Sequence, residues 1–307
     1  MIFNQKISYL YLTIAPFLWS TNHVLGKVLV NEIPPLTLSA IRISIAGLFL
    51  GVLLKRREGT KPTLRKKHYL LLLSMGFTGI FSFNFFLYCG LQYTTSTNGA
   101  IVNAFYPAIA LMLSAVFLKE MFNKKQFFGI VCSIFGVVLI TIQGSIGQIF
   151  TFNINPGDIL VLLSAVGWAV YSLLGKIAME ELSPLFVTTY SCIFGLVFLY
   201  PGMFIELIGE TDLSITWQSV VAIVYISLVV VVAQFLWNKG IHVVGPEIAA
   251  AFFNLTPIFT ATLAIIFLGE KIHWYHLMGG SLVLIGVLLG SVRGKSNKRV
   301  INDPVND

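Results

Sequence analysis

The residues that could do chemistry in this chain are polar and aromatic side chains inside long apolar stretches. Trp19 and His23 lie one helical turn apart and so share a helix face, and Trp168 and Ser172 repeat that spacing with Tyr171 beside them. An aromatic ring next to a hydrogen-bonding group can hold the apolar side chain and the polar head of one small molecule. These residues predict a substrate-binding site, with packing or anchoring at the membrane interface as the alternative.

Amide and phenol side chains recur at the same spacing in two further stretches. Asn84 and Tyr88 form one pair, and Gln234 and Asn238 form the other. Such groups line a substrate path or hydrogen-bond one membrane helix to another, and spacing alone favours neither role.

A proline follows an amide and aromatic residues in two other stretches. Because proline lacks the backbone N–H, it frees the carbonyl four residues earlier and kinks the helix. We predict a hinge or kink whose free carbonyl lines the binding site, with a packing kink as the alternative. The residues concerned are Asn103, Tyr106 and Pro107 in one stretch and Phe253, Asn254 and Pro257 in the other.

Few charges lie inside the apolar stretches. Arg42 is a candidate charge partner for a substrate carboxylate, although it could also reach the interface or cap helix-end carbonyls. His23 can change charge near neutral pH, which makes it a candidate carrier of a coupling proton, with a hydrogen-bonded packing role as the alternative. Asp158 and Glu247 open later stretches, where a carboxylate stabilises the positive end of the helix dipole, and they are further proton-carrier candidates.

The elements that must position these residues are membrane helices. The 307-residue chain is 56% hydrophobic and 11% charged, with a mean hydropathy of +0.85. A helix needs about 20 apolar residues to cross a bilayer, whereas barrel strands are about half that length. The sequence therefore predicts an all-α membrane protein with ten transmembrane helices. The expected spans are 9–29, 36–54, 69–91, 97–118, 125–143, 158–178, 185–207, 218–240, 247–268 and 274–292.

The last five spans echo the first five at an offset of 149 to 150 residues. Trp19, Gly26, Lys27, Pro35, Gly90, Pro107 and Glu120 fall on Trp168, Gly175, Lys176, Pro184, Gly240, Pro257 and Glu270. Because five is odd, the second half is inserted in the opposite direction, which gives two inverted five-helix repeats. We assign 1–144 to the first repeat, 145–157 to an outside linker, 158–292 to the second repeat and 293–307 to a cytoplasmic tail. Secondary transporters are recurrently built this way, although channels and structural duplications can be too.

Basic residues predict the orientation, because basic loops stay in the cytoplasm. With the N-terminus inside, every lysine and arginine except Lys27, Arg42 and Lys271 falls on the inner side. We expect an integral protein of the bacterial cytoplasmic membrane with both termini cytoplasmic. The net charge of +7 then belongs to loops near anionic lipid, and no basic stripe interleaved with aromatics predicts nucleic-acid binding. The expected partners are a small-molecule substrate, membrane lipid and a coupling proton, for a monomer or homodimer.

The paired order of these motifs resembles the drug/metabolite transporter superfamily, specifically its EamA-type members with ten spans. The resemblance covers nearly the whole chain and implies export or exchange of small metabolites, amino acids among them, through a cavity between the halves. The chain departs from the pattern at Ser191, where the second half lacks a counterpart of Arg42, and at Lys119, where the family more often has glycine. The motifs are Trp19 with Gly26-Lys27, Trp168 with Gly175-Lys176, Arg42, Tyr106-Pro107, Thr256-Pro257, Leu118-Lys119-Glu120 and Leu268-Gly269-Glu270.

The sequence thus predicts a secondary transporter and not an enzyme. It shows no phosphate-binding loop, no metal-ligand spacing and no nucleophile motif, so we expect no cofactor, no metal and no catalytic residue. The expected substrates are amino acids or related compounds, exported by alternating access. One alternative is a carrier of phosphorylated or nucleotide-linked sugars, which would call for more than one buried basic residue. The other is a membrane sensor or scaffold without flux.

Overall fold

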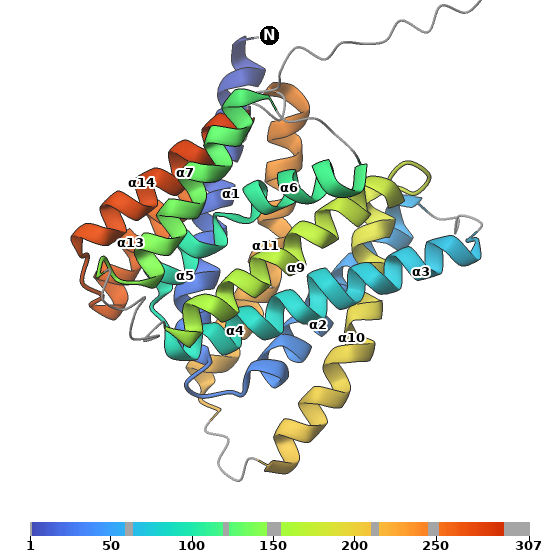
Figure 1. Cartoon of the computed structure of the whole chain (residues 1–307). Coiled ribbons are helices and arrows are strands. Elements are labelled where there is room, and N and C mark those ends of the chain that lie inside the picture. The colour runs from blue at the N-terminus through green and yellow to red at the C-terminus, as the bar shows by residue number, and fades with distance from the viewer. Residues whose placement is uncertain are drawn as a thin grey trace, which may run out of the picture.

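A computed structural model describes residues 2–58, 64–118, 123–145, 155–209, 215–244 and 252–291, and these ranges are helical apart from short connections (Figure 1). No strand occurs within them. The predicted linker and tail fall largely outside the described residues, as does Glu247. The prediction of an all-α fold is confirmed for the described part of the chain.

The first half contains five predicted spans. Its third span is a continuous helix with a π-helical turn in the middle, and its fourth span is split into two helices. The elements are α1 (Ile2–Leu29), α2 (Pro35–Glu58), α3 (Lys66–Met75), the π-helix η1 (Gly76–Ser82), α4 (Phe83–Tyr93), α5 (Ser96–Asn103), α6 (Tyr106–Leu118) and α7 (Lys124–Thr141).

The second half supplies the other five spans, and their ends lie within a few residues of the predicted ones, apart from the start of the ninth span, which is outside the described residues. They are α9 (Pro156–Ala178), α10 (Pro184–Gly209), α11 (Trp217–Val244), α13 (Leu255–Leu268) and α14 (Trp274–Ser291). Within the described ranges, seven helical segments are long and apolar enough to cross a membrane, and α13 and α14 are shorter apolar helices. The protein is therefore integral to a membrane.

Local sequence signals explain several helix ends. Pro35, Pro156 and Pro184 each begin a helix, where proline has the right backbone angle and its missing N–H is not needed. Asn155 precedes α9 and its side chain accepts the Gly157 N–H. The prolines and the Asn155 cap thus reduce the number of unsatisfied N–H groups at the starts of these helices.

Glycines permit the close contact between α7 and α14, which lie side by side in Figure 1. A methyl group on Gly129 would lie 2.5 Å from the Gly286 carbonyl oxygen, and one on Gly136 would lie 2.5 Å from that of Gly279. Any larger residue at these positions would push the two helices apart. The glycines of the fifth and tenth spans therefore serve packing, as their seven-residue spacing indicates.

Reciprocal contacts between α2 and α10 show that these repeat mates run in opposite directions. Near the end of α10, Glu206 accepts the N–H groups of Leu36 (2.9 Å) and Thr37 (2.7 Å) at the start of α2. At the other end, Glu58 closes α2 and accepts the hydroxyl of Ser183, just before α10, at 2.6 Å. Each carboxylate thus stabilises the positive end of the partner helix, as inverted repeats allow.

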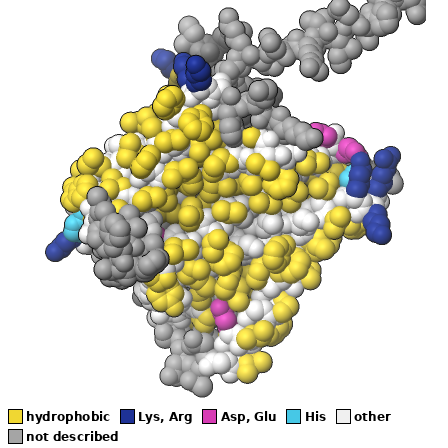
Figure 2. Space-filling model, viewed as in Figure 1, with side chains coloured by type: hydrophobic (Ala, Val, Ile, Leu, Met, Phe, Trp, Pro, Cys, Tyr) yellow, Lys and Arg dark blue, Asp and Glu magenta, His cyan; other side chains and the backbone are white. Residues whose placement is uncertain are grey.

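The surface fits a lipid environment. Figure 2 shows hydrophobic side chains over most of the visible face, with lysines and arginines gathered at its edges. Leu48 and Phe267, for example, are 73% and 71% exposed. Following the predicted orientation, we call the end where α1 leads into α2 the outer end of the bundle, and the opposite end the inner end.

Candidate functional site

A buried arginine lies at the centre of a polar cluster between α1, α2 and α4. Arg42 is only 5% exposed. Its Nη1 donates to Asn22 Oδ1 at 2.5 Å and its Nη2 donates to Asn84 Oδ1 at 2.7 Å. The guanidinium carbon lies 5.4 Å from the Tyr88 ring centre, and the Tyr88 hydroxyl donates to Asn22 Oδ1 at 3.2 Å. With His23, these residues form what we call the arginine cluster.

The arginine cluster holds a positive charge without a carboxylate. No aspartate or glutamate among the described residues pairs with Arg42, and its Nε has no hydrogen-bond partner. The Nδ1 of His23, which is 7% exposed, also has none. A buried charge without a counter-ion costs several kcal/mol, roughly, even when amides solvate it. The geometry therefore suits an anionic group that comes from elsewhere.

The π-helix η1 sets the position of Asn84. The Phe83 N–H reaches back five residues to the Thr78 carbonyl, which widens this turn of the third span. Asn84 Nδ2 donates to the Ile80 carbonyl at 2.6 Å, so its Oδ1 is turned toward Arg42. Single π-turns inside α-helices are frequent at functional sites.

Four aromatic residues from both halves form a second group, which we call the aromatic cluster. Trp19 of α1 lies 5.3 Å from Trp237 of α11 and 5.7 Å from Phe253, measured between ring centres. Tyr106, the first residue of α6, meets Phe253 edge to face at 5.2 Å. Because Trp19 is about one turn from Asn22 and His23 on α1, the two clusters adjoin. An apolar aromatic surface thus lies beside an uncompensated cation.

The second half places Trp168, Tyr171 and Ser172 differently from their first-half mates. The Trp168 ring lies 4.9 Å from both Phe83 and Tyr171. The Ser172 hydroxyl donates to the Trp168 carbonyl of its own helix at 2.8 Å. These residues join α9 to the third span, and they are not in the arginine cluster.

The predicted proline kinks lie at helix interruptions. The fourth span ends α5 at Asn103 and begins α6 at Tyr106, immediately before Pro107. Asn103 Nδ2 donates to Ser164 Oγ of α9 at 3.2 Å. In the ninth span, α13 begins at Leu255, so Pro257 lies in its first turn.

The other predicted amides have varied surroundings. Asn254 is buried, and neither its Oδ1 nor its Nδ2 has a hydrogen-bond partner. Gln234 is half-buried in α11. Asn238 lies in α11, but its side chain is outside the described part of the structure.

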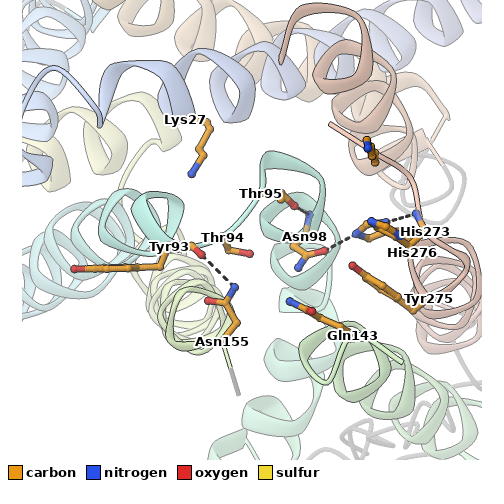
Figure 3. Close-up of a pocket in the computed structure, with 11 residues that line it drawn as sticks. Lys27, Tyr93, Thr94, Thr95, Asn98, Gln143, Asn155, His273, Tyr275 and His276 are labelled. Carbon is orange, nitrogen blue, oxygen red and sulfur yellow. Dashed lines mark hydrogen bonds between the residues drawn. The ribbon is translucent and has the colours of Figure 1, made fainter. Parts of the chain in front are cut away.

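A polar pocket at the outer end was not predicted. It measures about 280 Å³ and lies where the ends of α1, α4, α5, α7, α9 and α14 meet (Figure 3). Asp158, predicted to stabilise the α9 dipole, lies in the first turn of α9 and is 1% exposed, with hydrogen bonds from Thr94 and Asn98. The pocket is lined by Lys27, Tyr93, Thr94, Thr95, Asn98, Gln143, Asn155, Lys271, His273, Tyr275 and His276.

The sequence reasoning missed Asn22, Trp237 and this outer pocket. Asn22 lies beside the predicted His23, and it would have been found by treating every polar residue of the first span as a candidate. The pocket residues gave no such signal, because most of them flank the apolar stretches and have the composition of ordinary connections.

Comparison with known proteins identifies the chain's relatives. The sequence profile of the EamA-like transporter family matches residues 6–142 and, a second time, residues 155–292. The uncharacterized transporter YyaM of Bacillus subtilis is 31% identical over 273 residues, which cover 87% of this chain and 88% of YyaM. The uncharacterized transporter YetK of the same organism is 29% identical, covering 96% of this chain and 90% of YetK.

More distant comparisons agree with this match. An uncharacterized transporter of Archaeoglobus fulgidus is 27% identical over 94% of this chain and 99% of its own length. A solved crystal structure of a protein superposes with a TM-score of 0.61 at 18% identity, covering 93% of this chain and 97% of that one, which supports the fold. The double family match confirms ten helical spans arranged as two repeats.

Proposed function

Since the chain belongs to the EamA-like transporter family and is a membrane transporter of small molecules, we propose that it carries amino acids or closely related metabolites. In this proposal the protein is a secondary carrier of the bacterial cytoplasmic membrane. It works by alternating access of its two halves, and both termini are cytoplasmic. Export is the proposed direction, and it rests on the resemblance to EamA-type proteins alone.

The observation that supports this substrate class is the uncompensated charge of Arg42. The α-carboxylate of an amino acid would supply the missing counter-charge, and the unpartnered Nε of Arg42 offers it a donor. Asn22 and Asn84 hold the guanidinium in place before the substrate arrives. The adjoining aromatic cluster offers an apolar surface for the substrate's side chain.

The site also fits a carrier because both halves contribute to it. Trp19 and Tyr106 come from the first half, whereas Trp237 and Phe253 come from the second. Substrate sites of inverted-repeat transporters lie at the interface between the repeats, where relative motion of the halves exposes them to each side in turn.

The single buried cation disfavours the alternative cargo. Of the lysines and arginines in the described residues, Arg42 alone is buried. Phosphate groups carry more negative charge than a carboxylate and are usually bound by several basic groups. We therefore rank phosphorylated or nucleotide-linked sugars second.

A coupling proton remains part of the proposal. His23 is the candidate carrier because it is buried in the arginine cluster and its Nδ1 lacks a partner. If the rate of uptake into proteoliposomes does not respond to a pH gradient, or if His23→Gln keeps that response, this role is wrong.

Uptake into proteoliposomes tests the substrate class. The panel contains labelled amino acids, the corresponding amines without a carboxylate, and sugar phosphates. We expect saturable uptake of at least one amino acid and no competition by its amine. Uptake of sugar phosphates instead would support the alternative cargo, and no uptake by folded, inserted protein would support a sensor or scaffold.

Two tryptophan variants test the site. Trp19→Ala removes a ring from the aromatic cluster and should raise KM roughly tenfold, because burial of an aromatic surface contributes about 1 to 3 kcal/mol. Trp217→Ala is the matched control, since Trp217 is 76% exposed at the start of α11. Equal KM values for the two variants would remove Trp19 from the site.

A further inference from the structure

The outer pocket gathers polar side chains from both halves around one space. Figure 3 shows Lys27, Asn98 and Tyr275 converging from different helices, with Gln143 from the turn after α7. The volume of about 280 Å³ is just below the range of drug-sized ligand sites, so it suits a small solute.

A chain of hydrogen bonds fixes the protonation of His276 and the orientation of the Asn98 amide on one wall of the pocket. His276 Nδ1 accepts the His273 N–H at 2.9 Å, so His276 Nε2 carries its proton and donates to Asn98 Oδ1 at 2.8 Å. The Asn98 amide nitrogen is thereby turned toward both oxygens of Asp158, at 3.4 Å each. The wall therefore holds a neutral histidine, and the acceptors of Asn98 and Asp158 are occupied.

The charged side chains among the lining residues are positive. Asp158 is buried behind the wall, and no aspartate or glutamate is among the lining residues. Glu270, next to Lys271, is engaged by the N–H groups of Ser96 (2.7 Å) and Thr97 (3.0 Å) at the start of α5. Glu270 nevertheless lies close enough to Lys27 and His276 to interact with them electrostatically, and Asp158 does so with Tyr275, so these two carboxylates offset part of the positive charge.

Two lysines supply that positive charge. Lys27 is half-buried, and its Nζ donates to the Leu91 carbonyl at 2.6 Å. An ammonium group has three donors, so two remain for a ligand. Lys271 is exposed and also lines the pocket. Two ammonium groups with neutral hydrogen-bond donors around them form a receptor for an anion.

We propose that the outer pocket binds a small organic anion through its carboxylate, as an external waiting site in series with the arginine cluster. Lys27 lies four residues after His23, on the same face of α1 and about 6 Å further toward the outer end. A carboxylate leaving Arg42 on the outer side would meet Lys27 next. This step rests on the proposed transport of carboxylate-bearing substrates.

Protection of a single cysteine tests this site. His273→Cys places a thiol among the lining residues and keeps the backbone N–H that His276 uses. The protein in lipid nanodiscs is labelled with a hydrophilic maleimide, and the unsubstituted protein gives the background from Cys89, Cys132 and Cys192. Succinate is the probe, and succinamide, which has the same length without charge, is the control. We expect succinate alone to slow labelling.

Charge variants in the His273→Cys background identify the receptor. Lys27→Gln and Lys271→Gln should each raise the succinate concentration needed for half-protection roughly tenfold, because each variant loses one hydrogen bond to a charged group. Lys239→Gln is the control, because Lys239 is exposed near the inner end of α11. The proposal is overturned if succinamide protects as well as succinate does, or if succinate does not protect. It is also overturned if inorganic phosphate protects the thiol and succinate does not.

A second comparison separates this inference from the proposed function. Arg42→Gln should raise the KM for amino-acid uptake and leave succinate protection of His273→Cys intact. If protection is absent while uptake by the unsubstituted protein is normal, the waiting site is wrong and the carrier stands. If protection is present while no amino acid is taken up, the site exists but the proposed cargo is wrong.

Discussion

Replacing Arg42 with glutamine separates a functional role from a structural one. The variant removes the charge and two hydrogen bonds, to Asn22 at 2.5 Å and to Asn84 at 2.7 Å. Each lost hydrogen bond to a charged group costs about 1.5 to 3 kcal/mol. Removing a buried charge that lacks a counter-ion returns several kcal/mol, roughly, of desolvation free energy. We therefore expect the free energy of unfolding to change by no more than about 2 kcal/mol.

The effect on transport should be much larger. If the substrate carboxylate binds Arg42, the variant loses one charge-assisted hydrogen bond and its charge attraction, about 1.5 to 3 kcal/mol. That loss corresponds to a KM raised roughly 10- to 150-fold. Arg56→Gln is the matched control, because Arg56 is exposed in the last turn of the same helix and should leave KM unchanged.

Two measurements on the same preparations decide the outcome. Thermal unfolding in detergent reports stability, and initial uptake rates in proteoliposomes, corrected for folded protein, report KM. Retained stability with a raised KM supports carboxylate binding by Arg42. An unchanged KM per folded molecule, or a loss of uptake that parallels a loss of folded protein, would show that Arg42 is part of the scaffold.

Three further predictions concern stability. Gly79→Ala should lower the free energy of unfolding by about 1 to 3 kcal/mol, because the new methyl group would lie 2.2 Å from the tyrosine ring of α9. Gly51→Ala is the control, because its methyl group would have no atom within 4 Å, and chemical denaturation compares the two variants. Glu270→Gln removes a negative charge from the start of α5 and should lower the free energy of unfolding by about 1 kcal/mol in the same assay. An unchanged free energy of unfolding would show that the contact between Glu270 and the start of α5 does not stabilise the fold. Hydrogen bonds from Lys67 and, to a smaller extent, from the neighbouring histidine lower the pKa of Glu181. The contribution of Glu181 to stability is therefore present above its unfolded-state pKa and is lost as pH falls through its folded-state pKa. Glu181→Gln should therefore lose less stability on acidification than the unsubstituted protein, and identical thermal-unfolding profiles against pH would contradict this.

The sequence allowed the spans to be predicted because membrane helices leave a strong local signal. Twenty apolar residues in a row can be recognised without knowing their neighbours, and Pro107 marked the interruption between Asn103 and Tyr106 for an equally local reason. The inverted arrangement followed from counting spans. These features depend on single helices and on their order along the chain.

The site was harder to predict because it depends on contacts between distant residues. Arg42 was recognised as unusual, but its partners are 20 and 42 residues away in the chain. The π-turn that orients Asn84 has no sequence signature that we used. Whether Trp19 meets an aromatic residue or a lipid depends on the register of α1 against α11, which hydropathy does not encode.

The outer pocket shows a further limit. Asn98 contacts Asp158, 60 residues away, and His276, 178 residues away, so the hydrogen-bond chain exists only after both halves have folded together. Each of its residues has an ordinary explanation when read alone. Asp158, for example, was expected to stabilise its own helix or to carry a proton, and the structure adds partners from the other repeat.

Counterflow tests the central claim, that this protein is a carrier working by alternating access, most directly. Proteoliposomes are loaded with an excess of the unlabelled amino acid found in the uptake panel and diluted into a trace of the labelled form. The account predicts that loaded vesicles transiently accumulate label above the level in empty vesicles, because a site facing inward returns faster when it is occupied. Identical time courses in loaded and empty vesicles would contradict alternating access.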